Sequence, residues 1–586
     1  MIVYREHEQA STPEECISRI FSDLNRVEEN SAHEAAMELL INWGEFESAI
    51  EDAISPEKDY LNLLNKNLRA AGIFAGHIFR ASWERKSDEV KTWAGRLKFA
   101  LDEISVMKLP VEIKVKKPEG FVHYGLYPET YMEAAKKFYK DMRPAKAAVI
   151  GLRSIGTSLS AVVAATLESL GCAVQAFTVR PHGHPFDRKV EISQEFEKEL
   201  LRSGFDLFAV VDEGPGLSGS SITGMADRLS LAGIPDSRII LFPSWSPDGD
   251  NFKSEKARTR WKKHAKYTAS FEDLWIKTGR LAENLPSAGL MDISAGGWRA
   301  FFYANESDSP AVHPNHEKRK YFCSDNKVPL LLRFIGHGRY GREKFERAKA
   351  LAKAGFAQPV VGLSNGFLLA EFVNGRPISR NEVNPLMLDF MAEYLKFLRT
   401  NFVVERQTGF ENIREMMEVN ISLGLGEEWA DKLGFLDRFA SIMDESPAVA
   451  IDGHMMPNDW LLTYNGYVKT DCIDHYADQF FPCAQDIAWD LAGAITEFNL
   501  NPMQQEYLIS KYQAVTGDDV RRRIVFYSMA YLAYRLGYCV FAADELEPTL
   551  DGRKFRAMSG DYSARLKQQI SRFAADTSVA RARARG

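Results

Sequence analysis

The chain has 586 residues, enough for roughly three or four domains of ordinary size. Hydrophobic residues make up 45% and charged residues 26%, the balance of a globular protein, and no apolar run approaches the ~18 residues that cross a bilayer. A net charge of −7 argues against general nucleic-acid binding. The six cysteines form no CxxC pair and the chain begins with polar residues, so we expect a cytoplasmic protein without membrane partners.

The first part of the chain is predicted to be helical. Thr12 to Glu15 form a capping box with proline at the first helical position, and apolar residues then recur at helical spacing. Similar patterns continue to about residue 107. No catalytic grouping of side chains is visible in this region. We expect a helical cap or a dimerisation module, through which the protein could form a homo-oligomer.

Changes in the spacing of apolar residues divide the rest of the chain into further parts. After proline and lysine clusters near residues 109–118, strand and helix patterns alternate, as a parallel α/β sheet requires. The expected fold class is therefore multidomain α/β and α+β. The predicted parts are a helical N-terminal region (1–110), a parallel-sheet domain (111–245), a linker (246–284), a C-terminal domain (285–576) and a basic tail (577–586).

The most informative stretch lies between residues 208 and 221. Four apolar residues predict a buried strand, and Asp212 and Glu213 follow it directly. The loop that comes next contains Ser218, Gly219, Ser220 and Ser221. A helical pattern follows, and the N–H groups and dipole at such a helix start favour an anion. The two carboxylates can hold sugar hydroxyls or Mg²⁺ beside that anion. The alternative is an ordinary glycine-rich turn.

A second strand–loop–helix unit precedes this one, at residues 147–167. Its loop offers a guanidinium and backbone N–H groups that could hold a diphosphate, from Arg153, Ser154, Gly156 and Thr157. Between the two units, the segment 178–188 carries Arg180, a second arginine, two histidines and an aspartate. Such a segment suits a mobile hood over a phosphorylated sugar. The alternatives are a surface loop with incidental charges and a metal site formed by His182 and His184.

Together, these two units resemble the type I phosphoribosyltransferases, whose signature is an apolar strand, two acids and a loop with threonine and glycine. Serine replaces threonine here, and Gly214-Pro215-Gly216 departs from the pattern. The resemblance implies that PRPP with Mg²⁺ is the substrate. It implies that the acid pair binds the ribose hydroxyls, that residues 218–221 bind the 5′-phosphate, and that residues 153–157 bind the diphosphate. Arg180 would act from the hood.

The C-terminal domain has a different pattern. An apolar strand carries Arg333, a helical segment follows it, and two further strands end at Glu371. This order resembles the small lobe of the aminoglycoside phosphotransferases and related protein-kinase-like folds. The resemblance implies that Arg333 stands at the position of the nucleotide-binding lysine. Its ion-pair partner would be Glu343 or Glu346, and the backbone that starts at Glu371 would hold adenine.

Two later segments resemble the large lobe of the same family, which makes the predicted domain two-lobed. The catalytic loop is matched by Asp452 to Leu461, and the metal-binding strand by Val468 to His475. The resemblance implies ATP as a ligand and places His454 at the catalytic position. It also implies that Asp459 and Asp474 bind Mg²⁺, with Asp471 as a close alternative to Asp474.

This sequence departs from the kinase-like pattern at two of these positions. His454 replaces an aspartate base, although histidine has a suitable pKa for that role. Arg333 replaces lysine, and a planar guanidinium holds phosphate differently from a point charge. No clear glycine-rich phosphate loop is present, and the stretch from Ser294 to Trp298 is the nearest candidate.

We therefore expect a transferase in nucleotide or nucleoside-like metabolite chemistry. It would have one site for PRPP or a ribosyl phosphate and another for ATP–Mg²⁺, with small-molecule nucleotides or sugar phosphates as partners. The rival hypothesis is a non-catalytic nucleotide-binding sensor or scaffold. For the C-terminal domain, an active kinase, a degenerate nucleotide-binding fold and an unrelated helical domain all stay open.

Overall fold

The computed structural model describes residues 8–216, 218–283, 285, 289–324, 328–406 and 408–584, without the side chains of 282, 444 and 575–584. The chain divides into two compact units. The N-terminal unit comprises Glu6–Ser287 with Gly336–Arg342, and the C-terminal unit contains Ala288–Ile335 and Glu343–Gly586. The predicted helical region and the predicted parallel-sheet domain therefore belong to one compact unit.

Four helices begin the N-terminal unit: α1 (Pro13–Asn30), α2 (His33–Ile54), α3 (Leu63–Trp83) and α4 (Ser87–Ser105). The predicted capping box is confirmed, because Thr12 Oγ1 accepts a hydrogen bond from the Glu15 N–H and Glu15 accepts one from the Thr12 N–H. Helix α2 is buried along its whole length from Ala35 to Glu51. A helix buried on all sides has to neutralise its polar residues within the protein.

The predicted parallel sheet is confirmed. Its five strands lie in the order β4-β3-β7-β8-β9, and all their pairings are parallel. The strands are β3 (Lys146–Leu152), β4 (Ala173–Val179), β7 (Leu207–Val211), β8 (Ile239–Phe242) and β9 (Ala265–Lys266). Strand β9 and helix α10 (Glu255–Trp261) lie within residues 246–284. The segment predicted as a linker therefore completes the sheet, because its apolar residues are buried in the same core.

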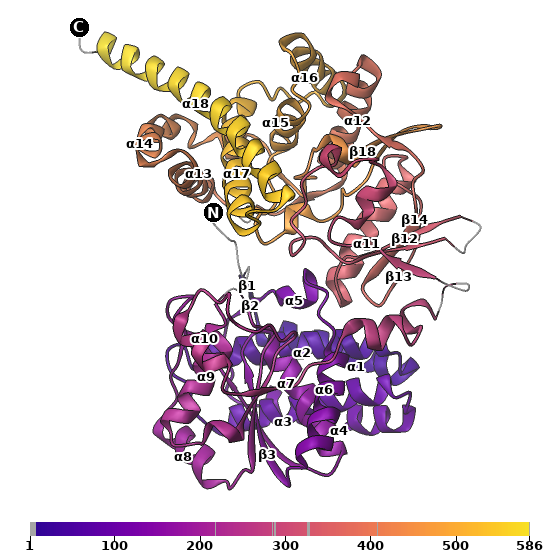
Figure 1. Cartoon of the computed structure of the whole chain (residues 1–586), viewed down its shortest axis with the longest axis vertical. Coiled ribbons are helices and arrows are strands. Elements are labelled where there is room, and N and C mark those ends of the chain that lie inside the picture. Colours follow the sequence, from indigo (N-terminus) through magenta and orange to yellow (C-terminus); the bar gives the residue numbers. More distant parts are fainter. Residues whose placement is uncertain are drawn as a thin grey trace. The chain divides into compact units, whose positions relative to one another are not determined.

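Helices cover both faces of this sheet, as a parallel sheet requires (Figure 1). Alternate residues of β3, including Ile150, pack with α8 (Gln194–Arg202), α9 (Ser220–Leu231) and α10. Helix α7 (Ile155–Ser169) packs against α6 (Pro128–Met142), α2 and α3. The N-terminal helices therefore act as a cap on α7 within their own unit.

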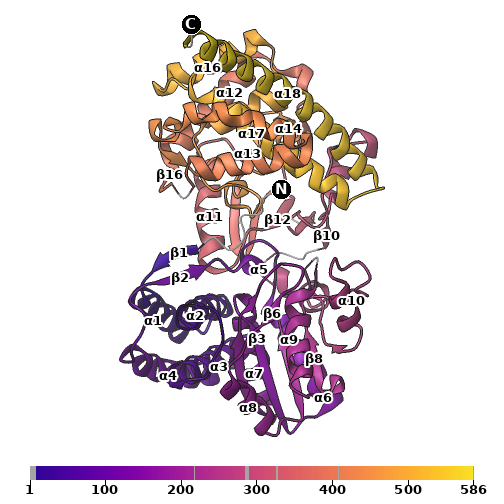
Figure 2. The same ribbon diagram turned by 90° about the vertical axis from the view of Figure 1, so that its left-hand side faces the viewer.

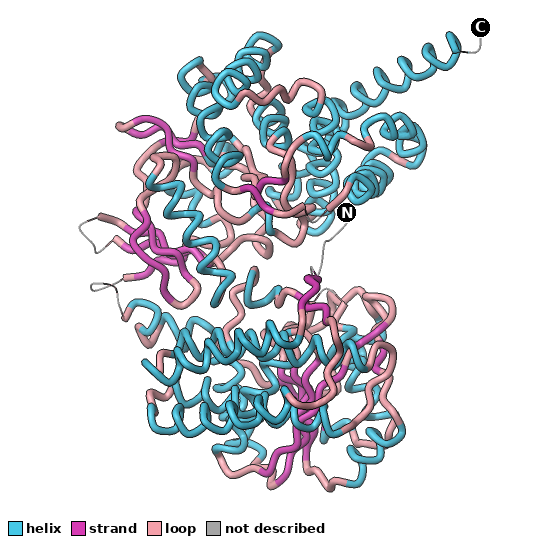
Figure 3. The backbone as a smooth tube through the Cα atoms, turned by 180° about the vertical axis from the view of Figure 1, so that it is seen from behind, coloured by secondary structure: helices cyan, strands magenta, loops and turns pink. Residues whose placement is uncertain are grey.

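The C-terminal unit begins with a five-stranded antiparallel sheet in the order β10-β11-β12-β14-β13. The strands are β10 (Leu290–Asp292), β11 (Lys320–Cys323), β12 (Leu330–Phe334), β13 (Val360–Ser364) and β14 (Phe367–Glu371). Helix α11 (Gly338–Lys353) follows β12. The predicted order of strand, helix, strand and strand is therefore confirmed (Figure 3).

A larger helical part completes the C-terminal unit (Figure 2). Its helices enclose one extensive apolar core. Its long helices are α12 (Pro385–Asn401), α13 (Phe410–Leu425), α15 (Ala488–Glu497), α16 (Pro502–Thr516), α17 (Arg523–Glu545) and α18 (Leu550–Ala584). The hairpin of β18 (Trp460–Thr463) and β19 (Gly466–Lys469) lies in this part.

Two of these helices differ from the sequence-based expectations. Helix α17 is long and apolar enough to cross a membrane by length and composition, which the sequence analysis did not anticipate. However, 67% of its apolar window is buried inside the protein, where it packs against α13, α15 and α18, so it has the environment of a core helix. Helix α18 continues to Ala584, through most of the predicted basic tail.

We predict that Gly76→Ala destabilises the N-terminal unit. A Cβ atom on Gly76 of α3 would lie 2.3 Å from the carbonyl oxygen of Ala161 in α7, so the two helices would have to separate. Such overpacking costs about 1–3 kcal/mol. Denaturant unfolding and hydrogen exchange of the α3 and α7 amides measure the loss.

Gly95→Ala is the matched control, because Gly95 is exposed on α4 with nothing near a new Cβ. It should stabilise the protein by about 0.5–1 kcal/mol through helix propensity. If both variants gained stability, the close approach of α3 and α7 would not be a real constraint.

Candidate functional site

The two segments that resemble a catalytic loop and a metal-binding strand come together around the β18–β19 hairpin. A short turn, η9 (Pro457–Asp459), leads into β18, and the loop 470–474 follows β19. The N–H of Thr470 donates to the carbonyl of Asp459 at 2.7 Å, which joins the two segments. Arg347 of α11 donates to the carbonyls of Ala450, Ile451 and Cys472, so α11 is held against both.

Arg333 is the central cation of this region. Its guanidinium pairs with Asp471 through Nη1 and with Asp474 through Nη2, the latter at 2.7 Å. Burial alone would raise the pKa of Asp474, but Arg333 lowers it to about 2, so this carboxylate is ionised at any working pH. Its second oxygen, Oδ2, is buried and has no hydrogen-bond partner within the described chain. A buried carboxylate oxygen without a partner is a candidate ligand atom for a cation.

A second buried cation, Lys469, pairs with two aspartates of the catalytic-loop segment. Lys469 Nζ lies 3.1 Å from Asp452 Oδ2 and 3.6 Å from Asp459 Oδ2, and its side chain is completely buried. Tyr394 also donates to Asp452 at 2.7 Å. Asp490 accepts hydrogen bonds from the N–H groups of Asp452 and the next residue. The loop is therefore fixed by charge as well as by packing.

Two histidines connect the two ion-paired groups. His454 Nδ1 lies 2.6 Å from Asp459 Oδ2, and the His454 ring stacks on His475 with 4.4 Å between centroids. His475 Nε2 lies 3.4 Å from Asp471 Oδ1. Burial lowers the pKa of His475, but Asp471 outweighs burial and raises it above its usual value. Arg333, His454, Asp459 and Asp474 therefore belong to one connected polar network, as their predicted roles require.

The donor set of this network fits Mg²⁺. Magnesium prefers carboxylate oxygens, usually from one or two carboxylates with phosphate and water completing the shell. Asp459 and Asp474 supply such oxygens, and Oδ2 of Asp474 is not occupied by another protein group among the described residues. Burial and then the charge of Asp459 raise the pKa of Tyr303 to about 12. It is therefore a neutral phenol at neutral pH.

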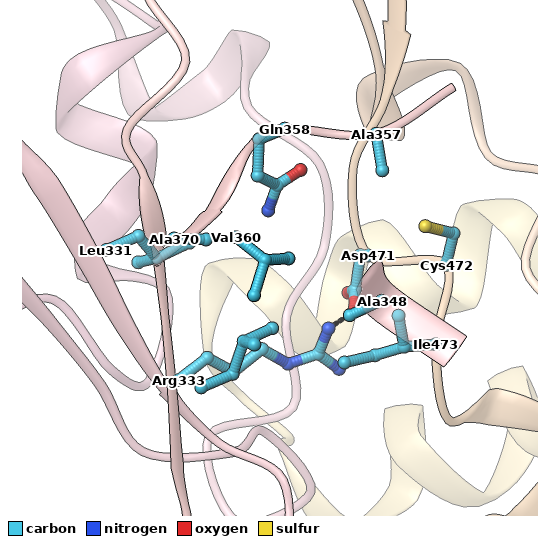
Figure 4. Close-up of a pocket in the computed structure, with 11 residues that line it drawn as sticks. Leu331, Arg333, Ala348, Ala357, Gln358, Val360, Ala370, Asp471, Cys472 and Ile473 are labelled. Atoms are coloured by element: carbon cyan, nitrogen blue, oxygen red, sulfur yellow. Dashed lines mark ion pairs between the residues drawn. The ribbon is translucent and has the colours of Figure 1, made fainter. Parts of the chain in front are cut away.

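A narrow cavity opens beside Arg333 and Asp471 (Figure 4). It lies between the small sheet and the loop that carries Asp471, and its other lining residues are mainly apolar, including Leu331, Val360 and Ala370. Its volume is about 20 Å³, room for a single water molecule. A nucleotide base could therefore enter only if the lining moved apart.

Three residues predicted for this site have other partners than the resemblance implies. Glu346 is exposed and pairs with Lys349 at 3.0 Å, so Arg333 takes the two aspartates as partners instead. Glu343 accepts a hydrogen bond from Tyr476 at 3.2 Å. At the predicted adenine-binding segment, the N–H of Glu371 donates to Pro359, which leaves the hinge fewer free donors than expected. Lys469 is the buried cation that sequence reasoning missed, since a lone lysine at a strand end gives no signal.

In the N-terminal unit, the predicted acid pair follows β7 at the carboxyl edge of the sheet. Asp212 Oδ1 accepts a hydrogen bond from the Glu213 N–H at 2.9 Å, and the Asp212 carbonyl accepts one from Tyr131 at 2.7 Å. Burial raises the pKa of Asp212 to about 7, although hydrogen bonds to its carboxylate partly oppose this. A carboxyl group with a pKa near 7 at a sheet edge is typical of binding sites.

The predicted hood segment lies over the predicted phosphate loop. Ser218 Oγ and Ser220 Oγ both donate to the carbonyl of Pro185, at 2.8 and 2.6 Å. Helix α9 begins at Ser220, directly after Gly219, whose positive φ of 62° suits glycine. Leu217 lies outside the described residues. The segment and the loop are therefore neighbours, and a bound phosphate would replace the serine hydroxyls' contacts with Pro185.

Arg153, predicted to bind the diphosphate, and Arg180, predicted to act from the hood, already have carboxylate partners. Arg153 is buried and pairs with Glu51 at 3.2 Å, Asp52 at 2.7 Å and Asp59 at 2.5 Å. Arg180 pairs with Asp52 and also donates to the carbonyl of Arg153 at 2.6 Å. Their charges are therefore neutralised within the protein, by carboxylates from α2 and the segment after it. A diphosphate would have to displace these partners.

Helix α2 also covers the loop 153–157, which was predicted to bind the diphosphate. Ser48 of α2 lies 2.8 Å from Thr157 Oγ1, and Thr157 is completely buried. Gly156 is buried at the start of α7. Ser154 adopts a φ of 117°, which is strained for a residue with a side chain. Strain of this kind is retained where the surrounding structure enforces it, often at functional loops.

No family model matches the sequence, and no curated protein matches it. Similar solved structures include choline kinase LicA from Streptococcus pneumoniae, with 13% identity over 51% of this chain and 99% of that chain, at a TM-score of 0.37. Plasmodium vivax ethanolamine kinase has 13% identity over 54% of this chain and 95% of that chain, at a TM-score of 0.35. Spectinomycin phosphotransferase, solved with ADP and spectinomycin, has 9% identity over 52% of this chain and 98% of that chain, at a TM-score of 0.31.

These similar proteins are small-molecule kinases, and each covers about half of this chain. The phosphoribosyltransferase-like interpretation gains no support from the comparisons and stays a prediction. Functional conclusions about this chain therefore rest on its own residues.

We predict that Lys469→Met unfolds the catalytic-loop segment of the C-terminal unit. It would leave Asp452 and Asp459 buried without their cation, which costs about 3–5 kcal/mol. Denaturant unfolding of the full chain measures the loss. Lys396→Met is the control, because its pair with Glu393 is solvent-exposed and should contribute less than about 1 kcal/mol.

Asp452→Asn in the Lys469→Met background should recover part of the lost stability, since it removes one of the two uncompensated charges. Equal stability of Lys469→Met and Lys396→Met would show that the buried pair is not needed to hold the loop.

We predict that Asp212→Asn changes how stability depends on pH. The pKa of Asp212 is raised in the folded state, so the folded protein holds this proton more tightly than the unfolded chain. Stability is therefore lost progressively as pH rises from about 4 to about 7, and then levels off. Asparagine removes this loss but keeps the oxygen that accepts from Glu213.

The asparagine variant should therefore gain stability over the wild type across that range and be more stable above about pH 7. Unfolding midpoints measured at a series of pH values test this. Parallel pH profiles for the two proteins would contradict the raised pKa.

Proposed function

We propose that the C-terminal unit is a phosphotransferase that uses ATP–Mg²⁺ and acts on a small metabolite. The observation that carries this proposal is the convergence of Arg333, Asp459 and Asp474 in one network, with a carboxylate oxygen of Asp474 unpartnered. Phosphoryl transfer depends mainly on positioning and charge neutralisation, which such a set supplies. The resemblance of both lobes to aminoglycoside phosphotransferases points in the same direction.

Each residue has a distinct proposed role. Asp459 and Asp474 would hold the magnesium, which would neutralise charge on the nucleotide phosphates. Arg333 would turn from its carboxylate partners to the phosphates, where a planar guanidinium can bind two oxygens at once. His454 would accept the proton of the acceptor hydroxyl, and its contact with Asp459 orients the ring.

A second candidate function, nucleotide binding without turnover, is favoured by one specific observation. Both proposed magnesium ligands are already paired with internal cations, Asp474 with Arg333 and Asp459 with Lys469. A site neutralised in this way can bind a nucleotide by exchanging partners and still lack a positioned base. The protein would then be a sensor or scaffold.

For the N-terminal unit, we infer binding of a ribosyl phosphate rather than turnover of PRPP. Residues 218–221 would bind the phosphate, and Asp212 with Glu213 would bind the ribose hydroxyls. Support comes from the hood segment over this loop. The pairing of Arg153 and Arg180 with carboxylates speaks against a diphosphate in the same state. We further propose a cytoplasmic protein whose partners are small phosphorylated metabolites.

We predict that ATP with millimolar Mg²⁺ raises the melting temperature of the full chain and binds by calorimetry. Asp474→Asn should remove Mg²⁺-dependent binding, because it deletes the charge of the proposed ligand. Asp437→Asn is the control, since Asp437 is an exposed residue of the same unit that pairs with Arg414 at the surface. Absence of any ATP effect on the wild type would refute the nucleotide site.

Turnover separates the two candidate functions. His454→Ala should keep ATP binding and lower ADP formation by about 10²–10⁴-fold if His454 is the general base. Amino alcohols and aminoglycosides are the first acceptors to test. Binding without ADP formation from any acceptor, in the wild type and in His454→Ala alike, would favour the sensor.

A further inference from the structure

We propose that the C-terminal unit contains a binding site for a divalent transition metal such as Zn²⁺, formed by His313, His316 and Glu545. The ligand atoms of these three side chains all lie within 4.8 Å of one another. The site is separate from the network around Arg333, with which it shares no residue, and it plays no part in the proposed phosphotransferase.

The backbone brings the two histidines together through a tight turn. The segment reads His313-Pro314-Asn315-His316, and the N–H of His316 donates to the carbonyl of His313 at 3.0 Å. Proline at the second position of such a turn is pre-organised for it. The turn places both imidazole rings on the same side, and the rings stack with 3.6 Å between centroids.

Helix α17 supplies the third ligand and the surroundings. Tyr538, Phe541 and Glu545 are spaced along one face of the helix, near its C-terminal end. Glu545 Oε2 lies 2.9 Å from His313 Nε2, close to the separation of about 3.3 Å for two ligands on one tetrahedral zinc ion. Phe541 lies parallel to the His316 ring and Phe480 packs against it at a tilt, so the two form an apolar shell.

The chemistry of the two imidazoles suits metal binding. His313 is only 4% exposed, and its Nδ1 is buried without a hydrogen-bond partner among the described residues. His316 Nδ1 lies 3.2 Å from the hydroxyl of Tyr538, so the other ring nitrogen is the one left for a metal. A neutral imidazole is the form that binds metals.

The ligand types decide which metals fit. Two imidazoles and one carboxylate suit Zn²⁺ and its neighbours, whereas Mg²⁺ and Ca²⁺ prefer oxygen ligands only. Three protein ligands leave a fourth position of tetrahedral zinc for water. Because a metal lies in the plane of each imidazole ring that binds it, two parallel stacked rings cannot both point at one ion. The half-buried His316 ring would therefore turn as the metal binds.

Cobalt titration of the full chain tests the site, because Co²⁺ in a tetrahedral site gives visible absorption and Zn²⁺ displaces it. Glu545→Gln and His316→Asn should each weaken Co²⁺ and Zn²⁺ binding by at least about a hundredfold. His184→Asn, an exposed histidine of the N-terminal unit, should bind as the wild type does. His475→Gln is a second control, since His454, Asp471 and His475 form the other possible metal cluster in the described chain.

The outcomes are distinct. Loss of binding in Glu545→Gln and His316→Asn alone supports the proposal. No visible Co²⁺ band in the wild type, or a band lost only in His475→Gln, overturns it. If a variant fails to fold, zinc X-ray absorption of the wild type decides instead, with two imidazoles and a carboxylate expected in the first shell. A first shell of oxygens alone would exclude the site.

Discussion

Both compact units contain buried carboxylates that are matched with buried cations. In the C-terminal unit, Lys469 lies between Asp452 and Asp459, and Arg333 between Asp471 and Asp474. In the N-terminal unit, Arg153 is surrounded by three carboxylates. A buried charge without a partner costs several kcal/mol, so none of these residues can be released without a replacement.

This constraint shapes what each unit can bind. The cations that a phosphate ligand would use are already neutralised, so binding has to exchange one set of partners for another. In the C-terminal unit, the proposed magnesium ion would take Asp459 and Asp474 as ligands while Arg333 turns to the phosphates. In the N-terminal unit, helix α2 holds Arg153 and Arg180 at the edge where a diphosphate would lie. The same physical rule therefore requires an exchange of partners in both units, for a nucleotide in one and for a diphosphate in the other.

The proposed metal site follows a different rule. His313 and His316 offer nitrogen ligands, which carry no negative charge that a buried cation would have to match. The turn that holds them beside α17 would bring these nitrogens to the proposed metal together with Glu545. The C-terminal unit would thus have two proposed metal sites that differ in ligand type: carboxylates for magnesium, and imidazoles with a carboxylate for a softer transition metal.

The sequence by itself determined the local structure. The capping box at Thr12, the strands that alternate with helices, the acids after β7 and the strand that carries Arg333 follow from short-range patterns, and the structure confirms these elements. The residue types of the phosphate loop and the catalytic-loop segment were also visible, because they lie next to one another in the chain.

Which charged and polar side chains pair with one another became clear only from the folded structure. Arg333 meets Asp474 across 141 residues, Arg153 meets Glu51 across 102, and His313 meets Glu545 across 232. Such pairs depend on how helices and sheets pack, and periodicity within one segment carries no information about that packing. The sequence therefore showed which side chains could bind a ligand, whereas the folded protein decided which of them are already bound to one another.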